Sequence, residues 1–278
     1  MGKQNGSSRE MTVPYSPEIL GVLNASPESM VEESIAVGDS EIRARGEYLI
    51  AEGATWIDLG GRSITPDAPM IDDAEEQRRL RHALGVLGKS AETNRPTPRV
   101  SVDTWSPETG IFALEAGADA VNYTGGPLPE SMLDAVARHD AALFMTFMPY
   151  ENAYVMRSSP RAEVGTQAVL DHLGPKIEAA RAAGIKKLAI DPNLGIIHAT
   201  TDDHQKIHQQ LEIVWQLDQI RSLGEPIFLY AARKPERLAR IMMASAIVHA
   251  RADYIRTHTP EMIVRLLATG DGAGKTAT

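Results

Sequence analysis

Ala51-Glu-Gly-Ala-Thr-Trp-Ile-Asp58 is the first of four segments that share one pattern. In each, a helix-like stretch ends at a glycine (an arginine in the fourth), and a short apolar run then leads to a polar residue. The other three are Glu115-Ala-Gly-Ala-Asp-Ala-Val-Asn122, Ala182-Ala-Gly-Ile-Lys-Lys-Leu-Ala-Ile-Asp191 and His249-Ala-Arg-Ala-Asp-Tyr-Ile-Arg256. A helix–strand unit takes about 30 residues, and the shared positions lie 64, 67 and 67 residues apart, so each interval holds two units. The repeat therefore predicts a single-domain (β/α)8 TIM barrel.

The rest of the chain alternates between apolar runs of strand length and helical patterns. The expected strands are 18–24, 55–59, 99–103, 118–122, 142–146, 187–191, 226–231 and 253–256. The expected helices are 40–52, 72–87, one that starts at Pro107 with Ser106 as its cap, 129–138, 163–183, 203–223, 234–250 and 260–267. We expect residues 149–160 to form an irregular active-site loop. A doubly wound open sheet is the competing fold, but the glycine-rich loop that usually follows its first strand is missing after Asn24.

Composition limits the classes of function. The chain has 278 residues, of which 43% are hydrophobic, and a formal net charge of −9, which argues against sequence-independent binding of nucleic acid. No apolar run reaches the roughly 18 residues of a membrane span, so no membrane partner is expected. Cysteine is absent, which excludes disulfides, zinc–thiolate sites and a thiol nucleophile. We interpret residues 1–15 as a flexible tail, 16–268 as the barrel and 269–278 as a disordered tail.

Polar residues stand at the ends of all the expected strands. In chain order they are Asn24, Asp58, Asp103, Asn122, Thr146, Asp191, Arg233 with Lys234, and Arg256 with His258. A barrel brings the carboxyl ends of its strands to one face. Carboxylates and carboxamides can bind the N–H and C=O groups of a nitrogen heterocycle, and the cations at the last two strands suit phosphate. Asn24 is a candidate ligand for Mg2+ that bridges phosphates. The face therefore predicts a heterocycle pocket beside an anionic leaving-group site.

A structural role is the alternative for each of these residues. An aspartate at a strand end caps a helix about as often as it binds a ligand, and Asp191 precedes Pro192, which suits a turn. Asp58 is expected to shape the following Gly60-Gly61 loop rather than to contact substrate. The chain lacks the Gly-x-Ser-x-Gly and His-Glu-x-x-His motifs, which disfavours hydrolases.

The strand-end motifs together resemble the dihydropteroate synthase family over about residues 18–268. They are Gly21-Val-Leu-Asn24-Ala-Ser-Pro-Glu-Ser, Asp58-Leu-Gly-Gly, Ser101-Val-Asp103, Val121-Asn122, Asp191-Pro192, Arg233-Lys234 and Arg256-Thr-His258. The stretches Pro66-Asp-Ala-Pro, Ser106-Pro-Glu-Thr and Tyr254-Ile-Arg-Thr-His-Thr-Pro resemble the sulfonamide-insensitive branch. The resemblance implies a (β/α)8 barrel, Mg2+ as cofactor, and a cytoplasmic homodimer that pairs through its last helices.

The resemblance also implies a reaction. Family members join a hydroxymethyl-dihydropterin pyrophosphate to p-aminobenzoate and release pyrophosphate, a step of folate biosynthesis. The residues implied in pterin binding are Asp103, Asn122, Asp191 and Lys234, and Met145 is a further candidate for substrate binding. Those implied in holding pyrophosphate and Mg2+ are Asn24, Arg256 and His258. Asp103, Lys234 and Asn24 are the candidate catalytic residues, and Arg62 and Arg233 are further cations for substrate binding.

Several positions depart from the family pattern, and most lie on the aminobenzoate side. Met30 stands where an aromatic residue is usual, and Ile64-Thr65 replaces a Thr-Arg pair, although Arg62 adds a cation nearby. The stretch from Asp191 to His198 lacks the usual aromatic residue and lysine. The pterin site is therefore better preserved than the site for the amine, which is either p-aminobenzoate or a related aryl amine.

Two alternative functions stay open at this point. One is a pterin-dependent methyltransferase domain that passes a methyl group to a corrinoid partner, and the cations at the last two strands count against it. The other is a non-catalytic paralogue that binds a pterin, which the altered loops favour. A folate-like pathway, such as that of methanopterin, is the alternative to folate.

Overall fold

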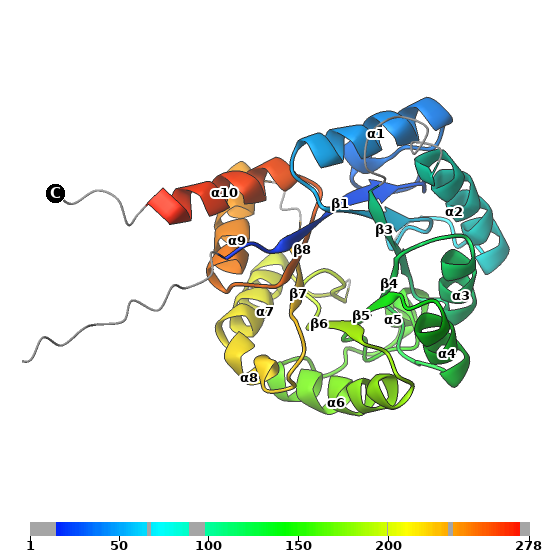
Figure 1. The fold of residues 1–278 in the computed structure, drawn as a ribbon. Coiled ribbons are helices and arrows are strands. Elements are labelled where there is room, and N and C mark those ends of the chain that lie inside the picture. Colours follow the sequence, from blue (N-terminus) through cyan, green and yellow to red (C-terminus); the bar gives the residue numbers. More distant parts are fainter. Residues whose placement is uncertain (1–14, 66–67, 89–97, 199, 233–235, 273–278) are drawn as a thin grey trace, which may run out of the picture.

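Eight parallel strands form a ring, and the helices lie outside it (Figure 1). The strands are β1 (Glu18–Asn24), β2 (Trp56–Gly60), β3 (Arg99–Thr104), β4 (Ala120–Tyr123), β5 (Ala142–Thr146), β6 (Lys187–Asp191), β7 (Phe228–Tyr230) and β8 (Tyr254–Thr257). Neighbours follow the order β6-β5-β4-β3-β2-β1-β8-β7, and a bridge between Ile190 and Ile227 joins β6 to β7. This arrangement confirms the predicted TIM barrel. The computed structural model describes residues 15–65, 68–88, 98–198, 200–232 and 236–272.

The helices follow the strands in the predicted alternation, with two differences. They are α1 (Asp39–Ala51), α2 (Asp73–Gly88), α3 (Pro107–Glu115), α4 (Glu130–Arg138), α5 (Ala153–Ser158), α6 (Thr166–Ala182), α7 (Asp203–Trp215), α8 (Leu217–Arg221), α9 (Arg237–His249) and α10 (Pro260–Gly272), with a 3-10 turn at Glu32–Ser34. The helix expected over 203–223 is divided into α7 and α8. The segment 149–160, expected to be irregular, contains α5.

The fourfold repeat has a common backbone geometry. Gly53, Gly117 and Gly184 have φ values of 97°, 97° and 85°, and Arg251 has 55°. Each lies two residues beyond the end of its helix, at the position where a left-handed residue, most often glycine, ends a helix. The next residue then begins the run into β2, β4, β6 or β8. The repeat in the sequence is therefore a repeated helix end that turns the chain into the barrel.

Apolar side chains fill the barrel at the amino ends of its strands. This floor consists of Leu20, Trp56, Ala120, Ala142, Phe144, Ala189 and Phe228, with Tyr254 packed against it. Trp56 and Phe144 meet edge to face with ring centroids 5.8 Å apart. Beneath them the Arg99 guanidinium lies 4.3 Å from the Trp56 ring centroid and pairs with Glu18 at 2.7 Å. The barrel interior is therefore closed at this end.

The edges of the domain differ slightly from prediction. α10 runs to Gly272, whereas the sequence predicted that the barrel ends at residue 268. Tyr15, assigned to the tail, donates a hydrogen bond to the Ala252 carbonyl at 2.7 Å.

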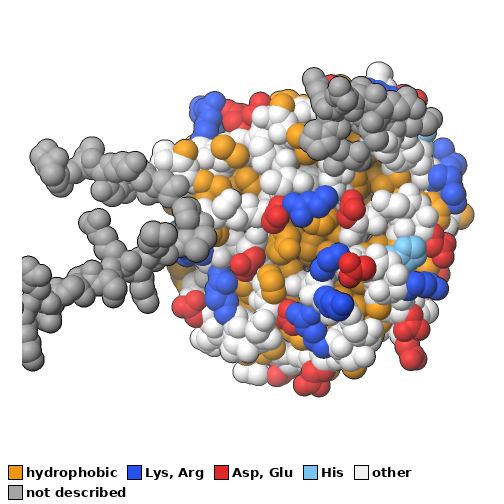
Figure 2. Space-filling view, in the orientation of Figure 1, with side chains coloured by type: hydrophobic (Ala, Val, Ile, Leu, Met, Phe, Trp, Pro, Cys, Tyr) orange, Lys and Arg blue, Asp and Glu red, His pale blue; other side chains and the backbone are white. Residues whose placement is uncertain are grey.

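On the face shown in Figure 2, acidic and basic side chains are interspersed around a hydrophobic centre. Within the described ranges, no helix combines the length and apolar character needed to cross a membrane.

Candidate functional site

The polar strand-end residues lie on the inner side of the barrel, above the floor. Side chains alternate between the two faces of a strand, so Asp58, two residues beyond Trp56, and Asp191, two beyond Ala189, share the inner face with those floor residues. The same alternation places Asn24, Asp103, Asn122, Arg256 and His258 inside the barrel. Six of the ten residues predicted for the site are thus brought to one mouth of the barrel.

Arg256 lies between two carboxylates. Its Nε donates to Asp58 at 2.5 Å and its Nη2 donates to Asp103 at 2.8 Å. The guanidinium also lies 4.7 Å from the centroid of the Tyr230 ring. Burial by itself lowers the pKa of Arg256, but the charges of Asp58 and Asp103 outweigh it and raise the pKa above its usual value. Arg256 is therefore a permanent cation at the centre of the site, held next to Asp103, one of the residues predicted to bind the heterocycle.

Asp58 has a more central place than the sequence indicated. Its side chain is fully buried and accepts hydrogen bonds from Ser101 Oγ at 2.5 Å, from Asn122 Nδ2 at 3.3 Å and from Arg256. The prediction that it shapes the Gly60-Gly61 loop missed these contacts, because its partners come from strands that are distant in the sequence. Asp58 thus links the two groups of residues predicted to bind heterocycle and anion.

Three groups above this network can accept hydrogen bonds from a ligand, and they belong to Asn122, Asp191 and Asp103. Asn122 is buried, and its Oδ1 has no hydrogen-bond partner among the residues that the structure describes. Asp191 accepts the backbone N–H of Asn193 at 2.8 Å, and Thr146 Oγ1 lies 3.5 Å from its other oxygen. Burial raises the pKa of Asp191 to about 7. Burial also raises the pKa of Asp103, and Arg256 opposes that shift.

The interior is rich in acceptors and negative charge. Among the described residues that meet there, the carboxylates of Asp58, Asp103 and Asp191 face one guanidinium, that of Arg256. Buried polar atoms need partners, and a carboxylate accepts only. The site therefore suits a flat ligand that presents several N–H donors along one edge.

Asn24, at the end of β1, presents a single oxygen toward Gly60 on β2. Its Nδ2 donates to Ser29 Oγ at 3.0 Å and to Ser34 Oγ at 2.8 Å, so Oδ1 points the other way. A side chain at position 60 would place its Cβ 2.8 Å from Oδ1, and Gly60 keeps that space clear. Within the described ranges no three His, Asp or Glu side chains form a metal cluster. One carboxamide oxygen nevertheless fits Mg2+ that takes its other ligands from water and phosphate.

His258 and Tyr230 form the adjacent part of the wall. Tyr230 Oη lies 2.9 Å from His258 Nε2, and the His258 carbonyl accepts a hydrogen bond from Arg45 at 3.1 Å. Tyr230 was not among the predicted residues. It lies two positions beyond Phe228 on β7, so the alternation along that strand already placed it on the inner face.

Arg62 does not join the interior set. Its Nη2 lies 2.5 Å from both Asp73 and Glu76 on α2, and its guanidinium stacks 4.8 Å from the centroid of the Trp105 ring. Its side chain is 5% exposed. The sequence suggested that this cation serves the substrate, but the structure shows it neutralised by two carboxylates that pack the β2–α2 connection.

The remaining predicted residues are elsewhere. Met145 is buried in the core between the barrel and the helices. It lies between Phe144 and Thr146 on β5, and the side chains of these two neighbours point to the opposite face of the strand. Strand alternation turns it away from the interior. Arg233 and Lys234 lie outside the described residues.

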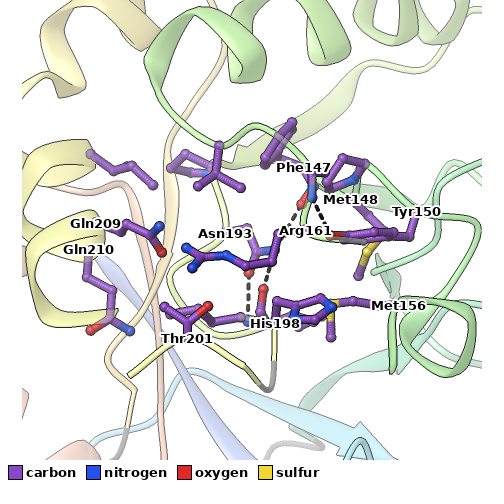
Figure 3. Close-up of a pocket in the computed structure, with 17 residues that line it drawn as sticks. Phe147, Met148, Tyr150, Met156, Arg161, Asn193, His198, Thr201, Gln209 and Gln210 are labelled. Atoms are coloured by element: carbon purple, nitrogen blue, oxygen red, sulfur yellow. Dashed lines mark hydrogen bonds between the residues drawn. The ribbon is translucent and has the colours of Figure 1, made fainter. Parts of the chain in front are cut away.

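A pocket of about 580 Å³, including its open mouth, lies beside Asp191 where β5 and β6 end (Figure 3). Phe147 and Met148 follow β5, and Asn193 and His198 follow β6. Arg161 extends across the pocket with its guanidinium toward Gln209 (Figure 3). The walls are largely apolar, and no Asp or Glu is among the seventeen residues that line it. Such a pocket suits an apolar ring with a negative charge at one end.

The chain resembles known proteins over most of its length. Residues 20–257 match the family described as pterin binding enzyme. A dihydropteroate synthase of Streptococcus pyogenes is 30% identical over 219 residues, which cover 78% of this chain and 75% of that protein.

Solved structures agree with the fold. The dihydropteroate synthase of Thermus thermophilus, in complex with 4-aminobenzoate, superposes with a TM-score of 0.70 at 25% identity and covers 92% of this chain and 94% of its own. The dihydropteroate synthase of Yersinia pestis, with a sulfonamide drug complex, superposes with a TM-score of 0.76 at 20% identity and covers 96% and 97%.

Proposed function

This chain belongs to the pterin binding enzyme family, and on that basis we propose that it is a dihydropteroate synthase-type transferase. It joins a hydroxymethyl-dihydropterin pyrophosphate to an aryl amine and releases pyrophosphate. The observation that carries this proposal is the meeting of three acceptors, Asp103, Asn122 Oδ1 and Asp191, inside the barrel. A pterin presents an amino group and ring N–H groups along one edge, which is the donor pattern that these acceptors require.

The reaction breaks one bond and forms another at the methylene carbon. The bond from this carbon to the pyrophosphate oxygen breaks, and the oxygen leaves with the electron pair. The lone pair of the amine nitrogen forms the new carbon–nitrogen bond, and the nitrogen then loses a proton to solvent. Carboxylates around the ring favour the positive charge that develops on the pterin as pyrophosphate leaves. The excess of Asp58, Asp103 and Asp191 over Arg256 supplies that field.

Mg2+ would be held by Asn24 Oδ1 together with the pyrophosphate oxygens, and its charge would stabilise the leaving group. His258, on the neighbouring strand end, lies on the same side of the mouth. Lys234 remains a candidate ligand of the pterin. The cytoplasmic location and the homodimer also stay predictions.

The pocket beside Asp191 is the place that we propose for the aryl amine. Its apolar walls suit the aromatic ring, and Arg161 suits a carboxylate. This cation matters because Ile64-Thr65 replaces the usual Thr-Arg pair and Arg62 is occupied by Asp73 and Glu76.

The replacement Arg161→Gln is expected to raise the KM for p-aminobenzoate about fivefold, since an exposed charge pair contributes about 1 kcal/mol. Its KM for p-toluidine, an aryl amine without the carboxylate, should stay the same. The steady-state rates with both amines give this comparison, and Arg138→Gln, on α4, is the matched control. An equal change of KM for both amines contradicts this placement of the carboxylate.

Purified protein with the pterin pyrophosphate, Mg2+ and p-aminobenzoate is expected to release one pyrophosphate for each dihydropteroate formed. Pyrophosphate release and product by chromatography are measured together, with and without EDTA. Product that forms equally well with EDTA argues against Mg2+. If the protein binds the pterin tightly but forms no product with any of a panel of aryl amines, the synthase proposal is wrong and the chain is a non-catalytic pterin-binding protein.

A further inference from the structure

Asp58 joins three strands through one carboxylate. It is fully buried on β2 and accepts from Ser101 on β3, Asn122 on β4 and Arg256 on β8. Its distances to the three donors are 2.5, 3.3 and 2.5 Å, respectively. A buried carboxylate that accepts from three donors fixes the orientation of each of them.

The orientation of Asn122 follows from the charge of Asp58. Asn122 Nδ2 lies 3.3 and 3.4 Å from the two Asp58 oxygens, so the carboxamide turns its N–H groups toward Asp58. Rotating the carboxamide by half a turn would place Oδ1 against a carboxylate, which is repulsive. Oδ1 is therefore left facing away, buried and without a partner among the described residues. Asp58 thereby determines that Asn122 offers an acceptor to a ligand.

Asp58 also shares the charge of Arg256. Because Arg256 Nε is bonded to Asp58, only Nη2 reaches Asp103. The other oxygen of Asp103 accepts a weaker hydrogen bond, from Thr124 Oγ1 at 3.3 Å. If Arg256 paired with Asp103 alone, the guanidinium would neutralise the Asp103 carboxylate. Because Arg256 also pairs with Asp58, Asp103 can still accept a hydrogen bond from a ligand.

We propose that Asp58 is a positioning residue that makes the barrel interior an acceptor surface, and that it thereby sets the preference for a 2-amino heterocycle over its 2-oxo analogue. The mechanism acts through Asn122 and Arg256 and needs no contact between Asp58 and the ligand. It rests on the proposed function, since it concerns recognition of the same pterin ring. A residue that only fills and neutralises the core would not alter this preference.

The test measures the binding of two probes by titration calorimetry. One is 6-hydroxymethylpterin, and the other is 6-hydroxymethyllumazine, which has an oxygen in place of the 2-amino group. Asp58→Asn removes the charge and lets Asn122 rotate. We expect the affinity for the pterin to fall about 10–100-fold and the pterin-to-lumazine ratio to fall at least tenfold, because unpaired buried polar groups cost about 1–3 kcal/mol.

The control Ser101→Ala removes a hydrogen bond to Asp58 but keeps its charge, so the ratio should stay within about twofold of the wild type. If Asp58→Asn fails to fold because Arg256 loses one of its two carboxylates, the double variant Asp58→Asn/Arg256→Met replaces it. The double variant should lose the preference for the pterin.

An unchanged ratio in Asp58→Asn, or in the double variant, overturns the inference. Failure of the wild type to bind the pterin at all would instead reject the proposed function.

Discussion

Replacing Asp191 by asparagine is expected to weaken the binding of 6-hydroxymethylpterin about 100-fold and to abolish its pH dependence. A carboxylate that accepts from a ligand contributes about 1.5–3 kcal/mol for each hydrogen bond. Burial raises the pKa of Asp191 to about 7, so the side chain is largely protonated at pH 6 and ionised at pH 8. Only the ionised form accepts two donors. The Kd of the wild type should therefore fall about tenfold from pH 6 to pH 8.

The same shift affects stability in the opposite sense. A carboxyl group whose pKa is raised on folding contributes stability that is present below its unfolded pKa of about 4, and this contribution is lost as the pH rises through the folded value. Without ligand, Asp191→Asn should remove this part of the decline in stability between pH 4 and pH 7.

Calorimetry at several pH values measures the Kd, and urea unfolding at the same values measures stability. A probe without phosphate avoids the ionisation of the pyrophosphate. Asp134→Asn, on the exposed side of α4, is the matched control and should change neither quantity. A wild-type Kd that is the same at pH 6 and pH 8 contradicts the prediction.

Replacing Arg62 by methionine is expected to destabilise the protein by about 3–5 kcal/mol, which lowers Tm by about 10 °C for a chain of this size. Glu76 is fully buried, and burial raises its pKa to about 7 even though Arg62 opposes the shift. Removing Arg62 leaves this carboxyl group buried without a cation. The loss of stability should be larger at pH 8 than at pH 5. At pH 8 the Glu76 carboxyl group is largely ionised in the wild type and depends on the charge of Arg62, whereas at pH 5 it is protonated.

The double variant Arg62→Met/Glu76→Leu removes both buried groups and should recover most of the lost stability. Thermal and urea unfolding of the four proteins completes a double-mutant cycle. Arg78→Met, in which an exposed pair with Glu75 is broken, is the matched control and should change stability by less than about 1 kcal/mol. Full stability of Arg62→Met would show that the β2–α2 connection does not depend on this pair.

The barrel was predictable because its signal is local and repeated. The left-handed residue after each of four helices and the short apolar runs both appear in the sequence, and the strand ends observed differ from the predicted ones by two residues at most. Helix α5 was missed for an equally local reason. It has only six residues, and its start depends on Asn152, whose side chain caps the N–H groups of Tyr154 and Val155.

The site was predictable in position but not in its connections. Strand ends indicated where Asp103, Asn122 and Asp191 would lie. They did not indicate that Arg256 would pair with Asp58, a residue 198 positions away, or that Arg62 would find Asp73 and Glu76 on the outer helix. Such pairings depend on which side chains the closed ring places within a few ångströms of one another.

The apolar floor makes the barrel a well with one opening. Trp56, Phe144 and Phe228 close its lower end, so any ligand that reaches Asn122 enters and leaves past the same rim. Under the proposed function the pterin lies deeper than the amine, and an amine already seated at the rim would obstruct it. The geometry therefore imposes a sequence of entry, with the pterin first and the amine second, and an excess of amine should slow the reaction by occupying the empty enzyme.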